Sequence, residues 1–209
     1  MAITTLFDKF TGEFTSYDNS KIVVASADYK VNYYKGWFCV INGVEYEITG
    51  NSKTEIFFNN SLSSTGTFEI VFIGRDFLKR IDSDFNDSVK IPDNLISNKY
   101  LMANDDLSSD INSKFRLDRT LDFEPLDNLL NLDAGRTYFA RYIASEIFSD
   151  LNGKFGSSFY IEKSDRQDHK MIESKKQCLE GISLDRNKNN KEDLVEKKED
   201  HSIHRFRRW

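Results

Sequence analysis

The chain has 209 residues, with 29 Lys or Arg against 34 Asp or Glu and a formal net charge of −5. Its aromatic content of 13%, including 17 Phe, excludes a wholly disordered chain, because such chains lack the large side chains that build a core. Two Pro and ten Gly exclude the collagen-like and Pro/Gly-rich low-complexity classes. The charge is divided unevenly: residues 1–153 carry −8 and residues 154–209 carry +3, and all three His lie in the second part.

Nothing in the sequence predicts export or a membrane span. The N-terminal residues show no basic leader followed by an apolar stretch of signal-peptide length. The longest apolar run is residues 37–41, whereas a transmembrane helix needs about 20 apolar residues. Cys39 and Cys178 are far apart in the sequence, which fits a reducing compartment better than a disulfide framework. We therefore expect a soluble protein, made in a cytoplasm and without a membrane partner.

Residues 21–74 have the pattern of short β-strands. A β-branched run at 22–25 is followed by two strand-like runs, 37–41 and 44–49, which are joined by Asn-Gly at 42–43. Asn-Gly between two such runs is the strongest short signal for a β-hairpin, because both turn positions need a positive φ. The sequence therefore predicts a hairpin here.

In the second arm of this hairpin, apolar residues alternate with Glu45 and Glu47, so one face is expected to meet water. Two further β-rich runs, 54–58 and 67–73, flank a Ser/Thr/Gly loop at 61–66. Parallel strands need long crossover connections, and this stretch has no room for them. It therefore predicts an antiparallel meander or a small barrel.

After residue 74 the pattern changes to helices. Apolar residues between 76 and 85 approach helical spacing, and Leu residues three and four apart predict a short helix over 125–132. The clearest stripe runs over 136–151 and predicts an amphipathic helix with its C-cap at Asn-Gly, 152–153. Residues 86–124 are rich in Asn, Asp and Ser and carry no clear periodicity, so no element is assigned to them.

Beyond residue 153 the apolar density falls sharply. One strand-like piece remains at 158–161, and a solvated spacer occupies 187–191. Such a segment cannot bury enough apolar surface to fold alone, so we predict an interaction arm over 154–209 that becomes ordered on a partner. The residues expected to anchor it form a helical stripe and a basic aromatic terminus: Met171, Ile172, Leu179, Ile182, Arg205, Phe206, Arg207, Arg208 and Trp209.

The terminus combines three Arg with Phe206 and Trp209. Cations interleaved with aromatic rings suit phosphates and bases, and they suit a protein groove equally well. Because a body of charge −8 repels nucleic acid, we favour a protein groove. Nucleic acid is kept as the alternative partner, and only at the C-terminus.

One acidic stretch resembles part of a calcium loop, with oxygen donors at alternate positions. Its candidate ligands are Asp82, Asp84 and Asp87. In a calcium loop, however, the sixth position is Gly and the twelfth is Glu, and this sequence has Asp87 and Asp93 there. A solvated acidic loop is therefore favoured over a metal site. A second acidic cluster at 105–110 fits the N-terminal charge of a helix.

No catalytic constellation is evident. No His precedes His169, which excludes Ser-His-Asp and Cys-His catalysis within residues 1–153, and no glycine-rich nucleotide loop is present. The pair Glu45 and Glu47 has the spacing of a solvent-facing strand, which is a commoner role than acid/base catalysis. A zinc site would have to use His169, Cys178, His201 and His204. Only His201 and His204 are closely spaced, and no second close pair accompanies them. We predict no enzyme and no cofactor.

The composition and the strand pattern of the β-rich stretch resemble those of a known class of protein. Residues 36–49, 54–58 and 66–75 combine short strands, an Asn-Gly hairpin and an Asn/Asp/Ser/Lys-rich composition. In these features residues 20–153 resemble the β-rich modules of tailed-phage virion proteins, above all ring or connector subunits between portal and tail, including those of crAss-like phages. No short motif of that family is present, so no functional residue is carried over. The resemblance implies a virion protein made in the host cytoplasm.

We therefore predict an α+β fold: an antiparallel β-meander or small barrel followed by helices, with an extended charged C-terminal arm. The expected domains are a globular body, 1–153, and the arm, 154–209. The expected function is a non-enzymatic structural subunit at the portal–tail junction, whose partners are copies of itself in a ring and portal or tail proteins. The alternative is a small nucleic-acid-associated or regulatory binding protein that uses its basic C-terminus.

Overall fold

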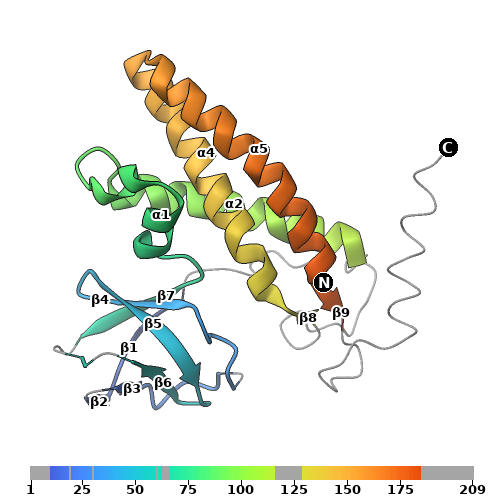
Figure 1. Cartoon of the computed structure of the whole chain (residues 1–209). Coiled ribbons are helices and arrows are strands. Elements are labelled where there is room, and N and C mark those ends of the chain that lie inside the picture. The colour runs from blue at the N-terminus through green and yellow to red at the C-terminus, as the bar shows by residue number, and fades with distance from the viewer. Residues whose placement is uncertain are drawn as a thin grey trace. The chain divides into compact units, whose positions relative to one another are not determined.

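The structure is a computed structural model (Figure 1), which describes residues 10–18, 20–29, 31–59, 61–62, 66–115 and 129–184. The chain divides into two compact units near residue 85. We call residues 7–85 the barrel unit and residues 86–184 the helical unit. The predicted boundary at residue 153 falls inside the second of these units, and the predicted α+β class is confirmed.

The barrel unit is an antiparallel sheet of seven strands in the order β1-β7-β4-β5-β6-β3-β2. Its strands are short, as the sequence pattern indicates. They are β1 (Phe10–Glu13), β2 (Ser16–Asp18), β3 (Lys21–Val23), β4 (Phe38–Ile41), β5 (Val44–Asn51), β6 (Glu55–Phe58) and β7 (Thr67–Val71).

The connection between β1 and β2 makes this sheet curl. The two strands lie at opposite edges, yet only Phe14 and Thr15 separate them in the chain. In a flat seven-stranded sheet the edges would be about 29 Å apart, whereas two linking residues reach about 10 Å. The edges must therefore approach each other, with β1 and β2 forming one bent strand. Both predicted descriptions apply, because β4, β5 and β6 form a meander within a barrel-like sheet.

The Asn-Gly hairpin is present as predicted, between β4 and β5. Asn42 and Gly43 both have a positive φ, 50° and 80°, and Val40 pairs with Glu45 across the hairpin. The other two β-rich runs are also strands, but they do not pair with each other. Instead β6 pairs with β5 and β3, and β7 pairs with β4 and β1.

The barrel interior is apolar. The alternating side chains of the paired strands enclose a core whose buried members include Ile22, Cys39, Ile48, Ile56, Phe68, Ile70 and Phe72. The sheet is followed by α1 (Arg75–Ile81) and by a 3-10 turn, η1 (Ser83–Asn86), which confirms the helical spacing predicted for residues 76–85.

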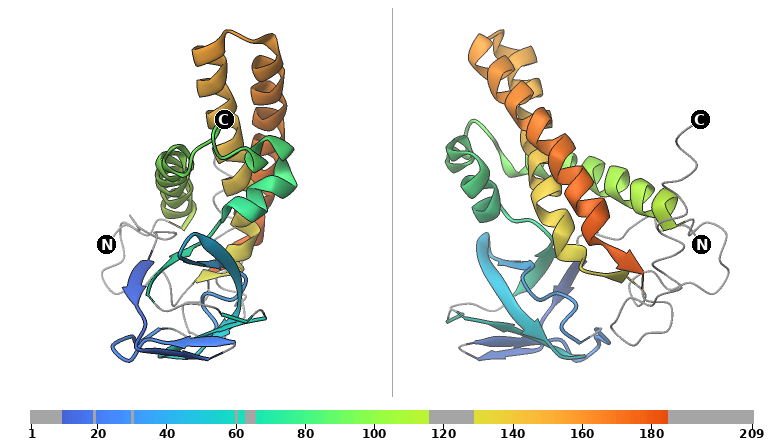
Figure 2. Two further views of the ribbon diagram at one scale, coloured as in Figure 1. Left: turned by 90° about the vertical axis from the view of Figure 1, so that its left-hand side faces the viewer. Right: turned by 45° about the vertical axis from the view of Figure 1, so that its right-hand side comes forward.

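The helical unit contains three long helices (Figure 2). They are α2 (Asp93–Phe115), α4 (Gly135–Phe155) and α5 (Ser158–Gly181). Short elements flank the last two: β8 (Leu129–Leu130), η3 (Leu132–Ala134) and β9 (Ser183–Leu184). The short helix predicted over 125–132 is wrong at 129–130, which form β8, and residues 125–128 lie outside the described residues.

Helices α4 and α5 form an antiparallel hairpin (Figure 2). Helix α4 confirms the amphipathic stripe predicted over 136–151, but its C-cap is Gly156, not Gly153. Gly156 has the left-handed φ of 60° that a C-cap glycine supplies without strain. At the opposite end of the hairpin, β8 pairs antiparallel with β9, so the segments before α4 and after α5 are joined.

The segment 158–181 differs from its prediction. The strand-like piece at 158–161 is wrong, because these residues form the first turn of α5. This part of the predicted arm is folded against α4, and it buries a face spaced three, four or seven residues apart: Tyr160, Lys163, Gln167, Ser174 and Cys178. Three of these five are polar, so the face does not appear as an apolar stripe in the sequence. The rest of the predicted arm, residues 185–209, lies outside the described residues.

Helix α2 occupies much of the stretch to which no element was assigned. It buries Tyr100, whose ring meets the Phe139 ring of α4 with centroids 4.8 Å apart, and also Ala103, Leu107 and Ile111. The acidic cluster at 105–110 was predicted at a helix N-terminus, and this is wrong. These residues lie in the middle of α2, because the helix begins at Asp93.

Candidate interaction surfaces

The ends of α4 and α5 that are connected by residues 156–157 expose large apolar side chains. Phe155, Phe159 and Ile161 are 56%, 50% and 46% exposed. The two Phe rings lie against Tyr160, with centroids 6.2 and 5.4 Å from it. Contiguous exposed apolar surface of this kind marks sites of interaction. We call this surface the hairpin tip.

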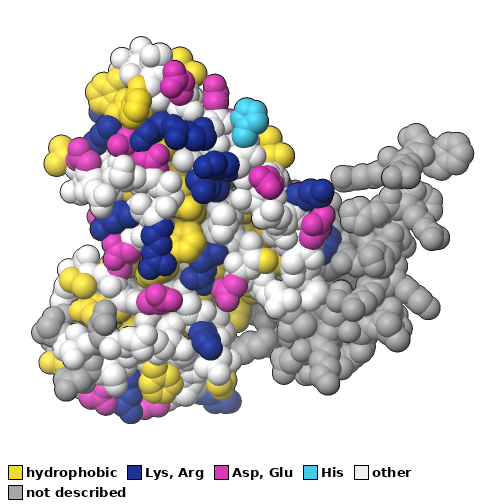
Figure 3. Space-filling view, in the orientation of Figure 1, with side chains coloured by type: hydrophobic (Ala, Val, Ile, Leu, Met, Phe, Trp, Pro, Cys, Tyr) yellow, Lys and Arg dark blue, Asp and Glu magenta, His cyan; other side chains and the backbone are white. Residues whose placement is uncertain are grey.

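Lysines surround the hairpin tip. The Lys154 ammonium lies 5.3 Å from the centroid of the Phe155 ring, and that of Lys90 lies 4.8 Å from the Tyr160 ring. Lys163 is buried, with its ammonium 4.9 Å from the Phe159 ring. Figure 3 shows hydrophobic and basic side chains side by side at this end of the hairpin. The hairpin tip therefore combines aromatic rings with lysines, and the exposed Glu162 follows Ile161 in the sequence.

The barrel unit carries a continuous series of ring contacts, of which only Phe10 and Tyr17 are exposed. Neighbouring rings in this series have centroids 5.0–6.4 Å apart. We call it the aromatic row. Its members, in order of contact, are Tyr17, Phe14, Phe68, Phe10, Tyr29, Tyr34, Tyr33, Trp37 and Phe72.

The aromatic row is buried in part. Phe68, Trp37 and Phe72 belong to the core, whereas Phe10 and Tyr17 are 37% and 41% exposed. The row includes a buried polar atom, the Tyr29 hydroxyl, which has no hydrogen-bond partner among the described residues. Burial raises the pKa of this hydroxyl, so it remains a protonated donor.

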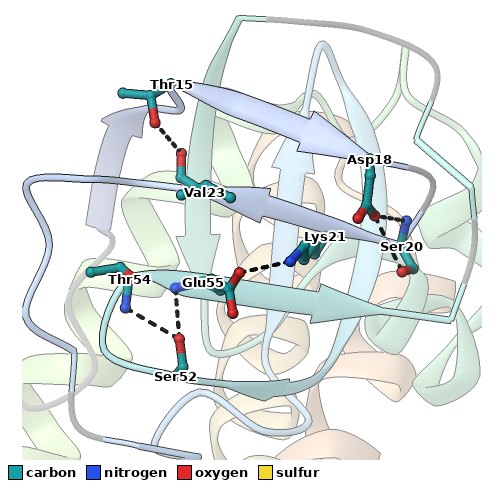
Figure 4. A network of polar contacts seen from close by, with 8 residues as sticks. All are labelled: Thr15, Asp18, Ser20, Lys21, Val23, Ser52, Thr54 and Glu55. Carbon is teal, nitrogen blue, oxygen red and sulfur yellow. Dashed lines mark hydrogen bonds and ion pairs between the residues drawn. The ribbon is translucent and has the colours of Figure 1, made fainter.

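Two acidic residues, Glu13 and Asp18, are close in sequence to the exposed end of the aromatic row but lie on the opposite face of their strands. Glu13 precedes Phe14 and is exposed, and Asp18 follows Tyr17. Asp18 is held in place because its Oδ1 accepts a hydrogen bond from the Ser20 backbone N–H at 2.9 Å (Figure 4). This bond lowers the pKa of Asp18. A further ion pair joins strands β3 and β6, where Lys21 Nζ lies 2.7 Å from Glu55 Oε1.

The four arm anchors predicted at 171–182 lie on or just after α5, and they are not equivalent. Ile172 is exposed, and Met171 and Leu179 are partly buried. Ile182 is buried in the helical unit, so this residue is unavailable to a partner. The end of α5 is held by Lys114 of α2, whose Nζ donates to the Leu179 carbonyl at 2.5 Å and to that of Ile182 at 2.7 Å. The predicted anchors Arg205, Phe206, Arg207, Arg208 and Trp209 lie outside the described residues.

The acidic loop that resembles a calcium site has a local structural role. Asp82 Oδ1 accepts from the Asp84 N–H at 3.0 Å. Asp87 Oδ1 accepts from the N–H groups of Val89 and Lys90, each at 3.0 Å. These are turn-stabilising bonds of the Asx type. Within the described part of the chain, no group of three or more His, Cys, Asp or Glu is arranged to hold a metal ion.

The two glutamates of the β4–β5 hairpin have different roles. Glu45 accepts hydrogen bonds from the first backbone N–H groups of α1, from Arg75 N at 2.5 Å and from Asp76 N at 2.8 Å. It therefore caps α1 from the neighbouring strand. A Cβ at Gly74 would come within 3 Å of its carboxylate, so a larger residue there would displace the Glu45 side chain from its capping position. Glu47 remains exposed.

The residues considered for zinc and thiol chemistry also have structural roles. Burial raises the pKa of both Cys39 and Cys178 to about 12, which keeps the two thiols protonated and unreactive at neutral pH. His169 Nδ1 lies 2.7 Å from the carbonyl of Asp165 on the preceding turn of α5. His201 and His204 lie outside the described residues.

Charged clusters join the helices of the helical unit. Lys99 of α2 lies 3.3 Å from Glu146 and 2.9 Å from Asp150 of α4. Lys175 of α5 lies 3.0 Å from Asp106 and 2.5 Å from Asp110 of α2, and the Tyr138 hydroxyl of α4 donates to Asp106. Burial opposes the charge of Lys175, but its hydrogen bonds to Asp110 and Asp106 outweigh burial and raise its pKa. These groups fix the helices to one another.

Comparison with protein-family models, with curated proteins and with solved structures found no match. Among the helices of the described residues, none is both long and apolar enough to cross a membrane.

Proposed function

We propose that this chain is a non-enzymatic structural subunit of a phage virion, a ring or connector component at the portal–tail junction. It assembles with copies of itself and with portal or tail proteins through its barrel unit, its helical hairpin and its C-terminal segment. The observation that carries the proposal is the hairpin tip. Two half-exposed Phe side chains and Ile161 stand at the end of a two-helix hairpin, where they have no role in the core.

The chemistry of the hairpin tip favours a protein contact. Aromatic side chains lose little conformational entropy on binding, and they dominate the energetics of interfaces. The lysines beside the rings add a charge that selects a partner surface with carboxylates at its rim. A second aromatic surface on the barrel unit gives the subunit two different patches. A heterologous contact joins two different patches, and such contacts close a ring when the rotation between subunits permits.

The function is tested by the composition of virus particles. Tailed particles from the source of the sequence are purified by density gradient, and their proteins are quantified by mass spectrometry. We expect the chain at a fixed copy number relative to the portal protein in particles that carry tails. Purified chain mixed with that portal protein is expected to form a complex of fixed stoichiometry in mass photometry. Absence of the chain from the particles, together with a monomer in every mixture, would refute the proposal.

A further inference from the structure

Helix α5 carries a second line of regularly spaced residues, on the side away from α4. Its buried face packs along α4 (Figure 2). About 150° around the helix from that face, at 100° per residue, lies a line of residues three or four positions apart. Three of them are apolar and three are charged: Ile161, Asp165, Asp168, Ile172, Lys176 and Leu179. We call this line the outer face of α5. Residues at this spacing lie along one side of a helix, so they meet a partner helix together.

The apolar side chains of the outer face are open to solvent. Ile161, which also belongs to the hairpin tip, is 46% exposed, Ile172 is 66% exposed, and Leu179 is partly buried. Because most of the Ile172 side chain lies outside the core of its own subunit, burying it against a second apolar surface is favourable. Three apolar residues do not identify the occupant of this surface. The charged residues between them do.

The charges of the outer face are ordered along α5. Asp165 and Asp168 lie in its first half, and Lys176 lies in its second half. Two copies of α5 that run parallel place like charges opposite each other. Two copies that run antiparallel about a two-fold axis place Asp165 opposite Lys176 twice, and they place Ile161 opposite Leu179 twice. The outer face is therefore complementary to itself in one orientation.

The two residues of this ion pair are accessible to a second copy. Asp165 is exposed. The Lys176 side chain is 77% exposed and lies 4.0 Å from Glu180 of its own helix, a surface pair that contributes little stability. Lys175 differs, because its ammonium is held by Asp106 and Asp110 of α2.

We propose that two copies of this chain pair through the outer faces of α5, antiparallel about a two-fold axis. Each copy contributes Ile161, Ile172 and Leu179 to the contact, and Asp165 of each copy pairs with Lys176 of the other. A helix of 24 residues is about 36 Å long, so one helix pair buries an area at the low end for a stable interface. We therefore expect a dimer that dissociates at micromolar concentrations. This contact does not rest on the proposed function, because it involves the chain alone.

Charge exchange in the full-length chain tests the contact and its orientation. Asp165→Lys and Lys176→Glu are measured by sedimentation equilibrium separately, as an equimolar mixture, and combined in one chain. Each single variant places like charges opposite each other, so its dimer should be at least about tenfold weaker than that of the unchanged chain. The mixture should regain the affinity, because changed side chains then face each other with unlike charges and so do the unchanged ones. The chain with both changes should regain it for the same reason.

Matched controls separate this contact from effects of net charge and of folding. Asp105→Lys on α2 and Lys170→Glu on α5 make the same changes in charge at exposed positions away from the outer face, and they should leave the dimer unchanged. Ile172→Ser alters a side chain that lies mostly outside the core, so circular dichroism should show an unchanged helix content. It is expected to weaken the dimer about fivefold or more.

Three outcomes would overturn the inference. If the unchanged chain stays monomeric at every concentration reached, α5 does not pair with itself. If the single charge variants associate as the unchanged chain does and only their mixture is stronger, the helices run parallel. If Ile172→Ser and both charge variants leave the dimer intact, copies of the chain meet through another surface. None of these results depends on whether the chain is found in virus particles, so the proposed function and this contact fail separately.

Discussion

The two units of this protein are stabilised in different ways. Among the described residues, the barrel unit buries one polar side chain, Asn51, whereas the helical unit buries seven: Lys99, Asn104, Ser108, Ser145, Lys163, Gln167 and Ser174. The barrel core is built from β-branched and aromatic side chains on a sheet that satisfies its own backbone. The helices meet through charged and amide groups, such as Arg141 Nη1, which donates to Gln167 Oε1 at 2.6 Å.

This difference has a physical consequence. Burial of apolar surface stabilises a fold whatever the charge state of its side chains, whereas buried charges cost free energy unless each keeps its partner. The barrel unit is therefore expected to respond little to single charge changes. The helical unit is expected to be specified by its polar pairs and to respond to their loss. The following experiments test this contrast, from the largest expected change in stability to the smallest.

The largest effect is expected from a cavity in the barrel core. Ile56 is fully buried and pairs with Ile22 on the neighbouring strand. Ile56→Ala should lower the free energy of unfolding by about 3 kcal/mol, measured by urea denaturation and located by hydrogen exchange. The half-exposed Val44→Ala serves as the control and should cost little. A loss below about 1 kcal/mol at Ile56 would mean that the barrel core is not the stable part of the chain.

The next largest effect is expected from the charge cluster of the helical unit. Lys175→Met leaves Asp106 and Asp110 facing each other without their cation. Because Lys175 is about one-third exposed, we expect a loss of about 1.5 kcal/mol. The neighbouring Lys176, with an exposed side chain 4.0 Å from Glu180, is the matched control, and Lys176→Met should change stability by less than about 0.5 kcal/mol. Equal losses of stability in the two variants would show that the ion pairs of Lys175 do not stabilise the helical unit.

Alkaline pH should weaken the helical unit through Tyr138. Burial and the hydrogen bond to Asp106 raise the pKa of Tyr138, so its neutral form is favoured in the folded state. Its contribution is fully present below the unfolded pKa of about 10 and decreases as the pH rises beyond it, by up to about 1.4 kcal/mol per pH unit. Lys175, whose pKa is also raised, acts in the same direction. Hydrogen exchange of α4 at pH 9 and pH 11 measures this. Tyr138→Phe should flatten the pH dependence.

The glutamates of the β4–β5 hairpin provide a pair of matched substitutions. Glu45→Gln weakens the cap on the first N–H groups of α1 and should cost about 1 kcal/mol. Glu47→Gln is two residues away on the same strand, exposed, and should cost almost nothing. Thermal melting of both variants measures how much the cap stabilises the protein. Identical melting temperatures would show that the cap contributes no stability.

The smallest change in stability is expected at the hairpin tip. Phe155→Ser with Phe159→Ser removes exposed rings and should leave the melting temperature within about 2 °C of the unchanged protein. Its effect should appear in assembly, as loss of the complex with portal protein. Leu101→Ser, at an exposed apolar position of α2, should retain that complex. If both variants assemble normally, the hairpin tip is not an interface.

The sequence was most informative where structure is local. Asn42 and Gly43 predicted the hairpin because the turn depends on the φ angles of those two residues. The stripe in α4 was recognisable because its buried residues are apolar. The length of that helix was not, because Gly153 and Gly156 are equally good C-caps and only packing against α5 decides between them.

The misassigned segments share one cause, which is that their buried faces contain polar residues. Helix α5 places Lys163, Gln167 and Ser174 at core spacing, and α2 does the same with Lys99 and Asn104. A search for apolar periodicity therefore does not detect these buried polar positions. The polar positions on α5, at spacings of four and seven between Tyr160 and Cys178, were the signal that would have identified the helix. For the surfaces, the sequence predicted basic aromatic anchors at the C-terminus but gave no indication of the hairpin tip or the aromatic row.

The sequence by itself determined the α+β class, the short antiparallel strands, the Asn-Gly hairpin and the α4 helix, because each depends on residues within a few positions of one another. Only the tertiary structure decided that β1 and β2 bend the sheet round on itself, and that Glu45 caps a helix 30 residues further along the chain. It also decided that a charged segment folds as α5. A lysine at a core position is stabilising only when its carboxylates arrive from another helix, and nothing in the local sequence provides that information.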